Sequence, residues 1–193
     1  MIGMTFSRSV VFLTAALCCA CLARAELATA GVALPLQDRE AGDLFGSRVA
    51  ISGNTILVGG PGNTSSSAGK VQVFVAGPSG WQYQTTLANP DARRFGTGVA
   101  IDGGRVVVGA PGSNTAYAYT GSGDVWTEAA QMTGAGGFGF DVQISDAATV
   151  VGMQNGSMAY AYTANDNWDE AEILGSGDYF GHSVDISGER AIV

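Results

Sequence analysis

The sequence has no cysteine after Cys21 and a single histidine, His182, in its 193 residues. The three cysteines, Cys18, Cys19 and Cys21, all lie near the start of the chain. If that start is removed, the remainder has no disulfide and no thiolate metal site, even in an oxidising compartment. One histidine without a cysteine also excludes zinc sites built from several such side chains.

Positive charge is scarce as well. The chain has nine lysines and arginines against 17 acidic residues, a net charge of −8. Arg8 and Arg24 precede the first acidic residue, so the part after residue 25 has a net charge of −10. An acidic surface repels phosphate backbones, which argues against nucleic acid as a partner. We expect the acidic loops to keep an exported protein soluble.

The first residues have the composition of a signal peptide. Arg8 precedes an apolar run over residues 10–22 that is too short to span a membrane comfortably. Small residues at Ala23 and Ala25 then suit cleavage after residue 25. Cleavage after Ala30 and lipidation at Cys21 are the alternatives. We therefore predict a signal peptide over residues 1–25, no stable membrane span after cleavage, and a secreted, periplasmic or cell-surface bacterial protein.

Helical periodicity is absent from the rest of the chain, which instead repeats one segment. Four copies begin at Phe45, Phe95, Phe138 and Phe180, each followed by glycine, at spacings of 50, 43 and 42 residues. The first two read FGSRVAISGNTILVGGP and FGTGVAIDGGRVVVGAP. A period of this size is the mark of a repeat array in which each copy packs against its neighbours.

Each copy is predicted to form four short strands. In the second copy these are residues 97–102, 105–109, 116–119 and 126–131, separated by Gly- and Pro-containing turns. The third strand recurs at 70–75 and 158–162, and residues 32–36 are predicted to be the outer strand of a preceding blade. Four-stranded antiparallel sheets at this period are blades of an all-β propeller. We predict an incomplete propeller over residues 26–193, with about three full blades and two partial ones.

These copies resemble the FG-GAP repeat of integrin-alpha-like propellers, most closely the bacterial type with its FG-x-S-V-A-I-S-G and V-V-V-G-A-P core. The core is carried by residues 45–61 and 95–111, with weaker matches at 138–154 and 180–193. The resemblance implies a propeller that usually closes with seven blades. The chain ends within a predicted central strand at Val193, so it is expected to be a C-terminally truncated fragment.

Calcium binding is not carried over from integrins. The turns between the first two strands of each copy read Ser-Gly-Asn, Asp-Gly-Gly, Ser-Asp-Ala and Ser-Gly-Glu, starting at Ser52, Asp102, Ser145 and Ser187. None of these turns supplies the five or more oxygen ligands that a calcium loop needs.

No residue is predicted to be catalytic, to bind a cofactor or to bind a metal. Residues 134–139 fit the dinucleotide pattern G-x-G-x-x-G, but a strand rather than a helix is predicted to follow. His182 occupies a variable repeat position, and no nucleophile-elbow sequence accompanies it. The acidic residues around Trp168 are expected to be solvated charges on an outer strand, a device that discourages sheet aggregation. They are Asp166, Asp169, Glu170 and Glu172.

Aromatic side chains recur in phase with the repeat. We expect them to pack between blades, although they could alternatively form platforms that stack on sugars. They are Trp81, Trp126, Trp168, Tyr117, Tyr119, Tyr160 and Tyr162. Two glycosylation sequons, beginning at Asn63 and Asn155, are predicted to lie in loops between second and third strands.

The resemblance implies a non-enzymatic scaffold that binds a protein or glycan, as in adhesion, at or outside the cell surface. One alternative is the propeller domain of a longer secreted enzyme or surface-anchored protein. The other alternative is a propeller lectin. Fold alone does not decide among them.

Overall fold

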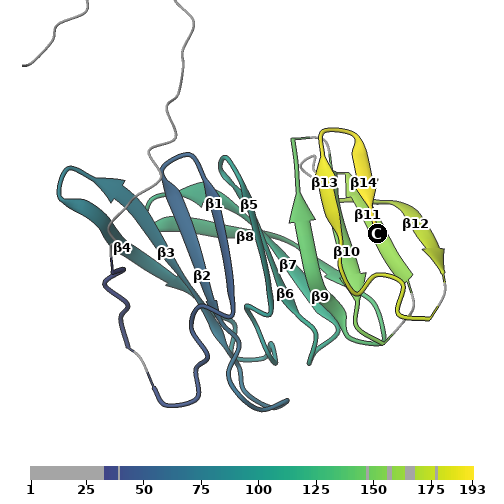
Figure 1. Ribbon diagram of the computed structural model, residues 1–193, viewed down its shortest axis with the longest axis horizontal. Coiled ribbons are helices and arrows are strands. Elements are labelled where there is room, and N and C mark those ends of the chain that lie inside the picture. Colours follow the sequence, from purple (N-terminus) through teal and green to yellow (C-terminus); the bar gives the residue numbers. More distant parts are fainter. Residues whose placement is uncertain (1–32, 39, 147, 156–157, 164–167, 177) are drawn as a thin grey trace, which may run out of the picture. The chain divides into compact units, whose positions relative to one another are not determined.

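The computed structural model describes residues 33–193 except residues 39, 147, 156–157, 164–167 and 177 (Figure 1). Ala33–Val193 form one compact unit, and the description concerns this unit alone. The predicted signal peptide, its cysteines and the alternative cleavage site after Ala30 lie outside the described residues. The described part of the chain has no helix, and so no helix there could span a membrane.

Every sheet of the unit is antiparallel, and its strands follow one another in chain order. Blade 1 contains β1 (Arg48–Ser52), β2 (Thr55–Gly60), β3 (Lys70–Gly77) and β4 (Gly80–Leu87). Blade 2 contains β5 (Gly98–Asp102), β6 (Arg105–Ala110), β7 (Thr115–Ser122) and β8 (Val125–Thr133). Blade 3 contains β9 (Phe138–Ile144), β10 (Ala148–Met153), β11 (Met158–Thr163) and β12 (Glu170–Ser176). A hairpin of β13 (Asp185–Ser187) and β14 (Arg190–Ile192) begins the next repeat.

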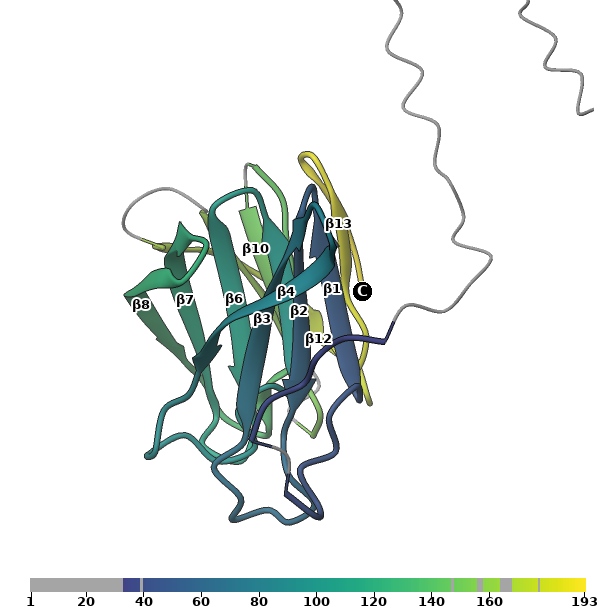
Figure 2. The same ribbon diagram turned by 90° about the vertical axis from the view of Figure 1, so that its left-hand side faces the viewer.

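This arrangement confirms the all-β propeller architecture. Successive four-stranded sheets pack face to face, and their first strands β1, β5 and β9 lie side by side (Figures 1 and 2). All four strands expected in the second copy are present as β5 to β8, each within a few residues of its predicted bounds.

The strand predicted over residues 32–36 is not formed. Val32 lies outside the described residues, and residues 33–37 have no strand assignment. The amide of Gln37 instead donates to Oε1 of Gln72 at 3.1 Å, and Nε2 of Gln72 donates to the carbonyl of Gln37. Pro35 has no amide hydrogen for a sheet ladder. The segment therefore satisfies a fully buried side-chain amide of blade 1 rather than extending a sheet.

The blades fit together because large and small side chains alternate along the third strand. In β7, Tyr117 and Tyr119 belong to the core cluster shared with blade 1. Ala116 and Ala118 point the opposite way and belong to the cluster shared with blade 3, where they meet Phe138. Since successive strand residues face opposite sides of a sheet, the Ala-Tyr alternation of β7 and β11 gives blades 2 and 3 a bulky face and a shallow face.

The phenylalanines that open the second and third copies are central to this packing. Phe95 and Phe138 are fully buried. Phe95 packs on the rings of Tyr117 and Tyr119 at centroid distances of 5.6 and 6.3 Å. Phe138 makes the same pair of contacts with the tyrosines of β11, at 5.6 and 6.3 Å. The expectation that these tyrosines pack between blades is confirmed.

Glycines set the distance between neighbouring blades. The second strand of each blade has a glycine at which a Cβ atom would overlap the backbone carbonyl of the next copy's Phe-Gly glycine. The pairs are Gly59 with Gly96, Gly109 with Gly139 and Gly152 with Gly181. The glycine of the second strand and the glycine of the Phe-Gly pair recur in each copy because the two backbones touch at these positions.

The three tryptophans do not behave alike. Trp126 packs against the cluster between blades 1 and 2, and Trp168 is buried in the cluster between blades 2 and 3. Trp81 is half-buried on β4 opposite Ala76 and belongs to neither of these clusters. Trp126 and Trp168 both face the preceding blade, and the described residues include no blade before blade 1, so packing of Trp81 between blades stays a prediction. Trp168 is also not a strand residue: its φ of 52° is incompatible with extended backbone, and β12 begins at Glu170.

Candidate functional site

The longer loops of the described blades gather at one end of the sheets. They connect the second strand to the third within a blade, and the fourth strand to the first of the next blade (Figures 1 and 2). The short hairpin turns lie at the opposite end. We call the first end the loop rim. Its described residues are 40–47, 61–69, 88–97, 111–114, 134–137, 154–155 and 178–184.

A left-handed residue precedes every Phe-Gly pair on the loop rim. Leu44, Arg94 and Tyr179 have φ values of 55°, 58° and 60°. The equivalent residue of the third copy is Gly137, with φ of 80°. Bulky residues rarely adopt this conformation, which costs roughly 1–2 kcal/mol for a side chain with a Cβ atom.

A recurrent turn holds this conformation. The amides of Ser47, Thr97 and His182 donate to the carbonyls of Leu44, Arg94 and Tyr179 at 3.1, 3.2 and 3.2 Å. In the second copy, the hydroxyl of Thr97 also donates to the carbonyl of Arg94 at 2.8 Å. Phe95 and Phe180, which follow Arg94 and Tyr179, pack in or against the core clusters between blades. Leu44 and Tyr179 stay accessible. The exposed fractions are 52% for Leu44 and 77% for Tyr179.

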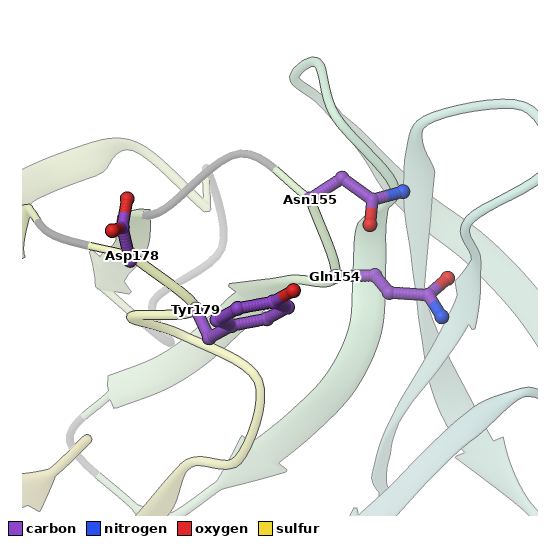
Figure 3. Close-up of a pocket in the computed structure, with 4 residues that line it drawn as sticks. All are labelled: Gln154, Asn155, Asp178 and Tyr179. Atoms are coloured by element: carbon purple, nitrogen blue, oxygen red, sulfur yellow. The ribbon is translucent and has the colours of Figure 1, made fainter.

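Tyr179 lines a polar cavity of about 380 Å³ at the junction of blade 3 and the next repeat (Figure 3). The other lining residues are Gln154, Asn155 and Asp178. The amides of Gln154 and Asn155 donate to the carbonyls of Gly137 and Gly136 at 3.3 and 2.7 Å, which ties the β10–β11 loop to the loop before β9. Two carboxamides, a carboxylate and an exposed aromatic ring can together bind hydroxyl groups and stack on an apolar face.

A second polar cavity, of about 340 Å³, lies between residues 40–43 and the loop from Gly62 to Lys70. Lys70 donates to the carbonyl of Asp38 at 2.7 Å and pairs with Asp43 at 3.2 Å. Burial opposes ionisation of Asp43, but the amide of Glu40 and the ammonium of Lys70 outweigh it, so the pKa of Asp43 lies below its ordinary value. Asp43 therefore stays charged and already paired at neutral pH.

A third cavity, of about 200 Å³, lies where the first strands of three blades begin. It contains two arginines, Arg48 and Arg94. The other lining residues are Leu44, Ser47, Pro61, Gly62, Thr97 and Phe140.

Among the described residues, His182 and the acidic residues around Trp168 show no arrangement that indicates catalysis. The ring of His182 contacts the ring of Phe140 at a centroid distance of 4.8 Å, with the two ring planes inclined by 49°. Asp169 is exposed beside β12, Glu170 and Glu172 lie on β12, and Asp166 lies outside the described residues. Within the described part of the chain, no group of three or more His, Cys, Asp or Glu side chains could hold a metal ion.

The dinucleotide-like segment 134–139 leads into strand β9 at Phe138, as its context predicted. A Cβ atom at Gly134 would overlap the ring of Phe138, so this glycine serves packing. The sequon asparagines Asn63 and Asn155 follow β2 and β10, in the loops predicted for them.

The sequence patterns did not predict the left-handed backbone before the Phe-Gly pairs. Leu44, Arg94 and Tyr179 share no chemical property, and only their place before Phe-Gly relates them. Gly137, at the equivalent position of the third copy, was the one available indication that this site demands positive φ.

Comparison with known proteins gives one family. The FG-GAP repeat matches residues 33–74, which lead into blade 1 and include β1, β2 and most of β3. No curated protein matches the sequence.

Similar folds occur among solved structures. One is KlHsv2 with loop 6CD replaced by a Gly-Ser linker, with 12% identity over 72% of this chain and 40% of that chain, and a TM-score of 0.47. Another is Kluyvelomyces marxianus Hsv2, with 11% identity, the same coverages and a TM-score of 0.47. A europium-containing methanol dehydrogenase has 14% identity over 70% of this chain and 26% of that chain, with a TM-score of 0.47. The chain thus spans less than half the length of these structures.

Proposed function

Because residues 33–74 are an FG-GAP repeat within a β-propeller, we propose that the protein is an exported, non-enzymatic scaffold that binds a protein or glycan ligand through its loop rim. The observation that carries this proposal is the cavity around Tyr179. A large aromatic side chain is held there in a strained backbone conformation and is 77% exposed, beside three polar side chains.

The backbone strain at Tyr179 supports a role for this residue in binding. Glycine would adopt φ of 60° without strain, as Gly137 does at the equivalent position. Strained residues persist where the surrounding structure over-determines them, and they gather at ligand-binding sites. Tyrosine loses little conformational entropy on binding and offers both a ring face and a hydroxyl, which is why it is enriched at recognition surfaces.

A glycan is the ligand class that suits this cavity best, which favours the lectin alternative as a second candidate. Gln154 and Asn155 each offer amide donors and a carbonyl acceptor, and Asp178 offers acceptors. Sugar hydroxyls need this mixture, and the apolar face of a pyranose ring can stack on Tyr179. Adhesion at a cell surface would follow from display of this rim.

Export rests on the amino-terminal segment. The apolar run over residues 10–22 followed by Ala23 and Ala25 supports cleavage after residue 25. The mass and amino-terminal sequence of the product secreted by a bacterial host would test this, since retention of residues 1–25 on a cell-associated product would contradict it.

Binding is tested by screening the full chain against an array of glycans, followed by titration of any hit. Tyr179→Ala should weaken binding at least about tenfold, because a central tyrosine commonly contributes more than about 1.4 kcal/mol to an interface. Trp81→Ala is the control, since it removes a half-exposed aromatic residue from an outer strand. Equal affinity of Tyr179→Ala and the unmodified chain for the same ligand would remove the cavity from the proposal.

A further inference from the structure

The loop rim of this acidic protein contains a cavity whose charged lining is basic. Arg48 and Arg94 line it, and no carboxylate is among the described residues that do so. The chain as a whole has only nine basic residues against 17 acidic ones. Two arginines among the eight residues that line one small cavity of such a chain call for an explanation.

Neither guanidinium is neutralised by a carboxylate of the described residues. Ion pairs there engage Lys70 and Arg105, with Asp43, Asp102 and Asp146 as partners. Nη1 of Arg48 donates to the carbonyl of Ser47 at 3.2 Å, which leaves further donors on a five-donor fork. The backbone of Arg94 is bonded at both ends, to the carbonyl of Ser67 at 2.6 Å and from the amide of Thr97 at 3.2 Å.

The position of Arg94 has a cost that packing does not explain. It is the left-handed residue before Phe95, with φ of 58°, where glycine would be free of strain. The strained turn brings Arg94 into a cavity shared with Arg48 of blade 1 and Phe140 of blade 3. Residues from three blades therefore meet at the point where the first strands begin.

We propose that this cavity binds the oxyanion group of a ligand, a carboxylate, sulfate or phosphate, between Arg48 and Arg94. Guanidinium forks match the paired oxygens of these groups and bind them in two-pronged fashion. The hydroxyl of Ser47 is an additional donor at the wall, and Leu44 and Phe140 form an apolar border. A volume of about 200 Å³ is below the roughly 300 Å³ of complete small-molecule sites, so the cavity suits the charged end of a larger ligand.

Titration of the full chain at low ionic strength tests the proposal. The probes are inorganic sulfate, inorganic phosphate and D-galacturonate, with neutral D-galactose as the uncharged comparison. The chain should bind at least one of the charged probes, and D-galactose at least tenfold more weakly. Preference for D-galacturonate would identify a sugar acid as the source of the oxyanion, and preference for sulfate or phosphate an ester or free ion.

Variants locate the site. Arg48→Gln and Arg94→Gln should each weaken binding of the preferred probe at least tenfold. Arg93→Gln is the matched control, because Arg93 is exposed and adjacent but does not line the cavity. Binding in the double variant Arg48→Gln/Arg94→Gln that equals binding in the unmodified chain would overturn the proposal, as would failure of every charged probe to bind.

Arg94→Gly separates binding from folding. Glycine relieves the left-handed strain, so the melting temperature should be retained or raised while the affinity for the charged probe falls at least tenfold. Tyr179→Ala should leave that affinity unchanged, which distinguishes this site from the cavity of the proposed function. Loss of affinity together with a large fall in the melting temperature in both Arg94 variants would indicate a structural arginine and contradict the proposal.

Discussion

At the scale of single residues, the loop rim and the blade interfaces obey different rules. At the blade interfaces, side-chain volume matters most: Phe95 and Phe138 fill the space against tyrosine rings. Residues one position earlier, Leu44, Arg94 and Tyr179, accept backbone strain instead. One position is thus buried for packing, and the position before it is strained and accessible. We therefore expect function at the loop rim rather than in the core.

Thr149 is a buried residue whose hydroxyl group is not hydrogen-bonded to any described residue. It is fully buried on β10, and its Oγ1 has no hydrogen-bond partner within the described part of the chain. Thr149→Val removes an unpaired polar group at nearly constant volume and should stabilise the fold by about 1 kcal/mol in chemical denaturation.

Thr115→Val is the control for this substitution. Thr115 is similarly buried, but its hydroxyl donates to the carbonyl of Ser113 at 3.1 Å. Loss of that bond should lower the free energy of unfolding by about 1 kcal/mol. If both substitutions were equally destabilising, Thr149 would have a partner in solution.

At the scale of the element, the second strand of each blade needs a glycine where the backbone of the next copy packs against it. Gly109, the next-to-last residue of β6, lies against the carbonyl of Gly139 near the start of β9. No side chain can be accommodated there, because the obstruction is backbone and cannot change rotamer.

Gly109→Ala should therefore separate blades 2 and 3 locally and destabilise the protein by about 3 kcal/mol or more, measured by urea denaturation. Gly103→Ala is the matched comparison. Gly103 has φ of 56° but open space around its Cβ position, so only the conformational penalty of about 1 kcal/mol applies. Similar losses for the two variants would mean that the blades move apart without cost.

At the scale of the whole molecule, equivalent strand positions have unequal surroundings. Ile51 of β1 and Ile101 of β5 occupy the same place in their copies of the repeat. Ile101 is 8% exposed because blade 1 covers it, whereas Ile51 is 63% exposed. With Val49 and Leu34 it borders an apolar cavity of about 400 Å³.

This inequality predicts opposite results for one substitution at two equivalent sites. Ile101→Lys places a charge between blades and should cost about 3 kcal/mol or more in the free energy of unfolding. Ile51→Lys should change it by no more than about 0.5 kcal/mol. A large loss for Ile51→Lys would show that this face of blade 1 is covered in solution.

Much of the fold was predictable because the repeat reports the same physics several times. Alternation in Ala-Tyr-Ala-Tyr, the turn glycines and the β-branched runs act over a few residues, so local sequence suffices to place the strands. The strand predicted over residues 32–36 is not formed, because the amide of Leu36 donates locally to the carbonyl of Leu34 and the adjoining Gln37 bonds to the side chain of Gln72 rather than to a strand. Trp168 does not lie on the predicted outer strand, because its backbone is left-handed and β12 begins only at Glu170.

The candidate sites were less predictable. Arg48 and Arg94 are 46 positions apart in the sequence and meet only because two blades place their first strands side by side. The Tyr179 cavity likewise joins a β10–β11 loop to the segment before β13.

The sequence by itself determined the all-β repeat, the strands within its copies to within a few residues, and most of the residues that pack between blades. Those features depend on side-chain alternation and turn chemistry, which a linear pattern contains in full. Only the tertiary structure decided which copies cover one another, which Phe-Gly neighbours take left-handed backbone, and which arginines share a cavity. These depend on the close stacking of blades, a long-range geometry that brings distant residues to one rim.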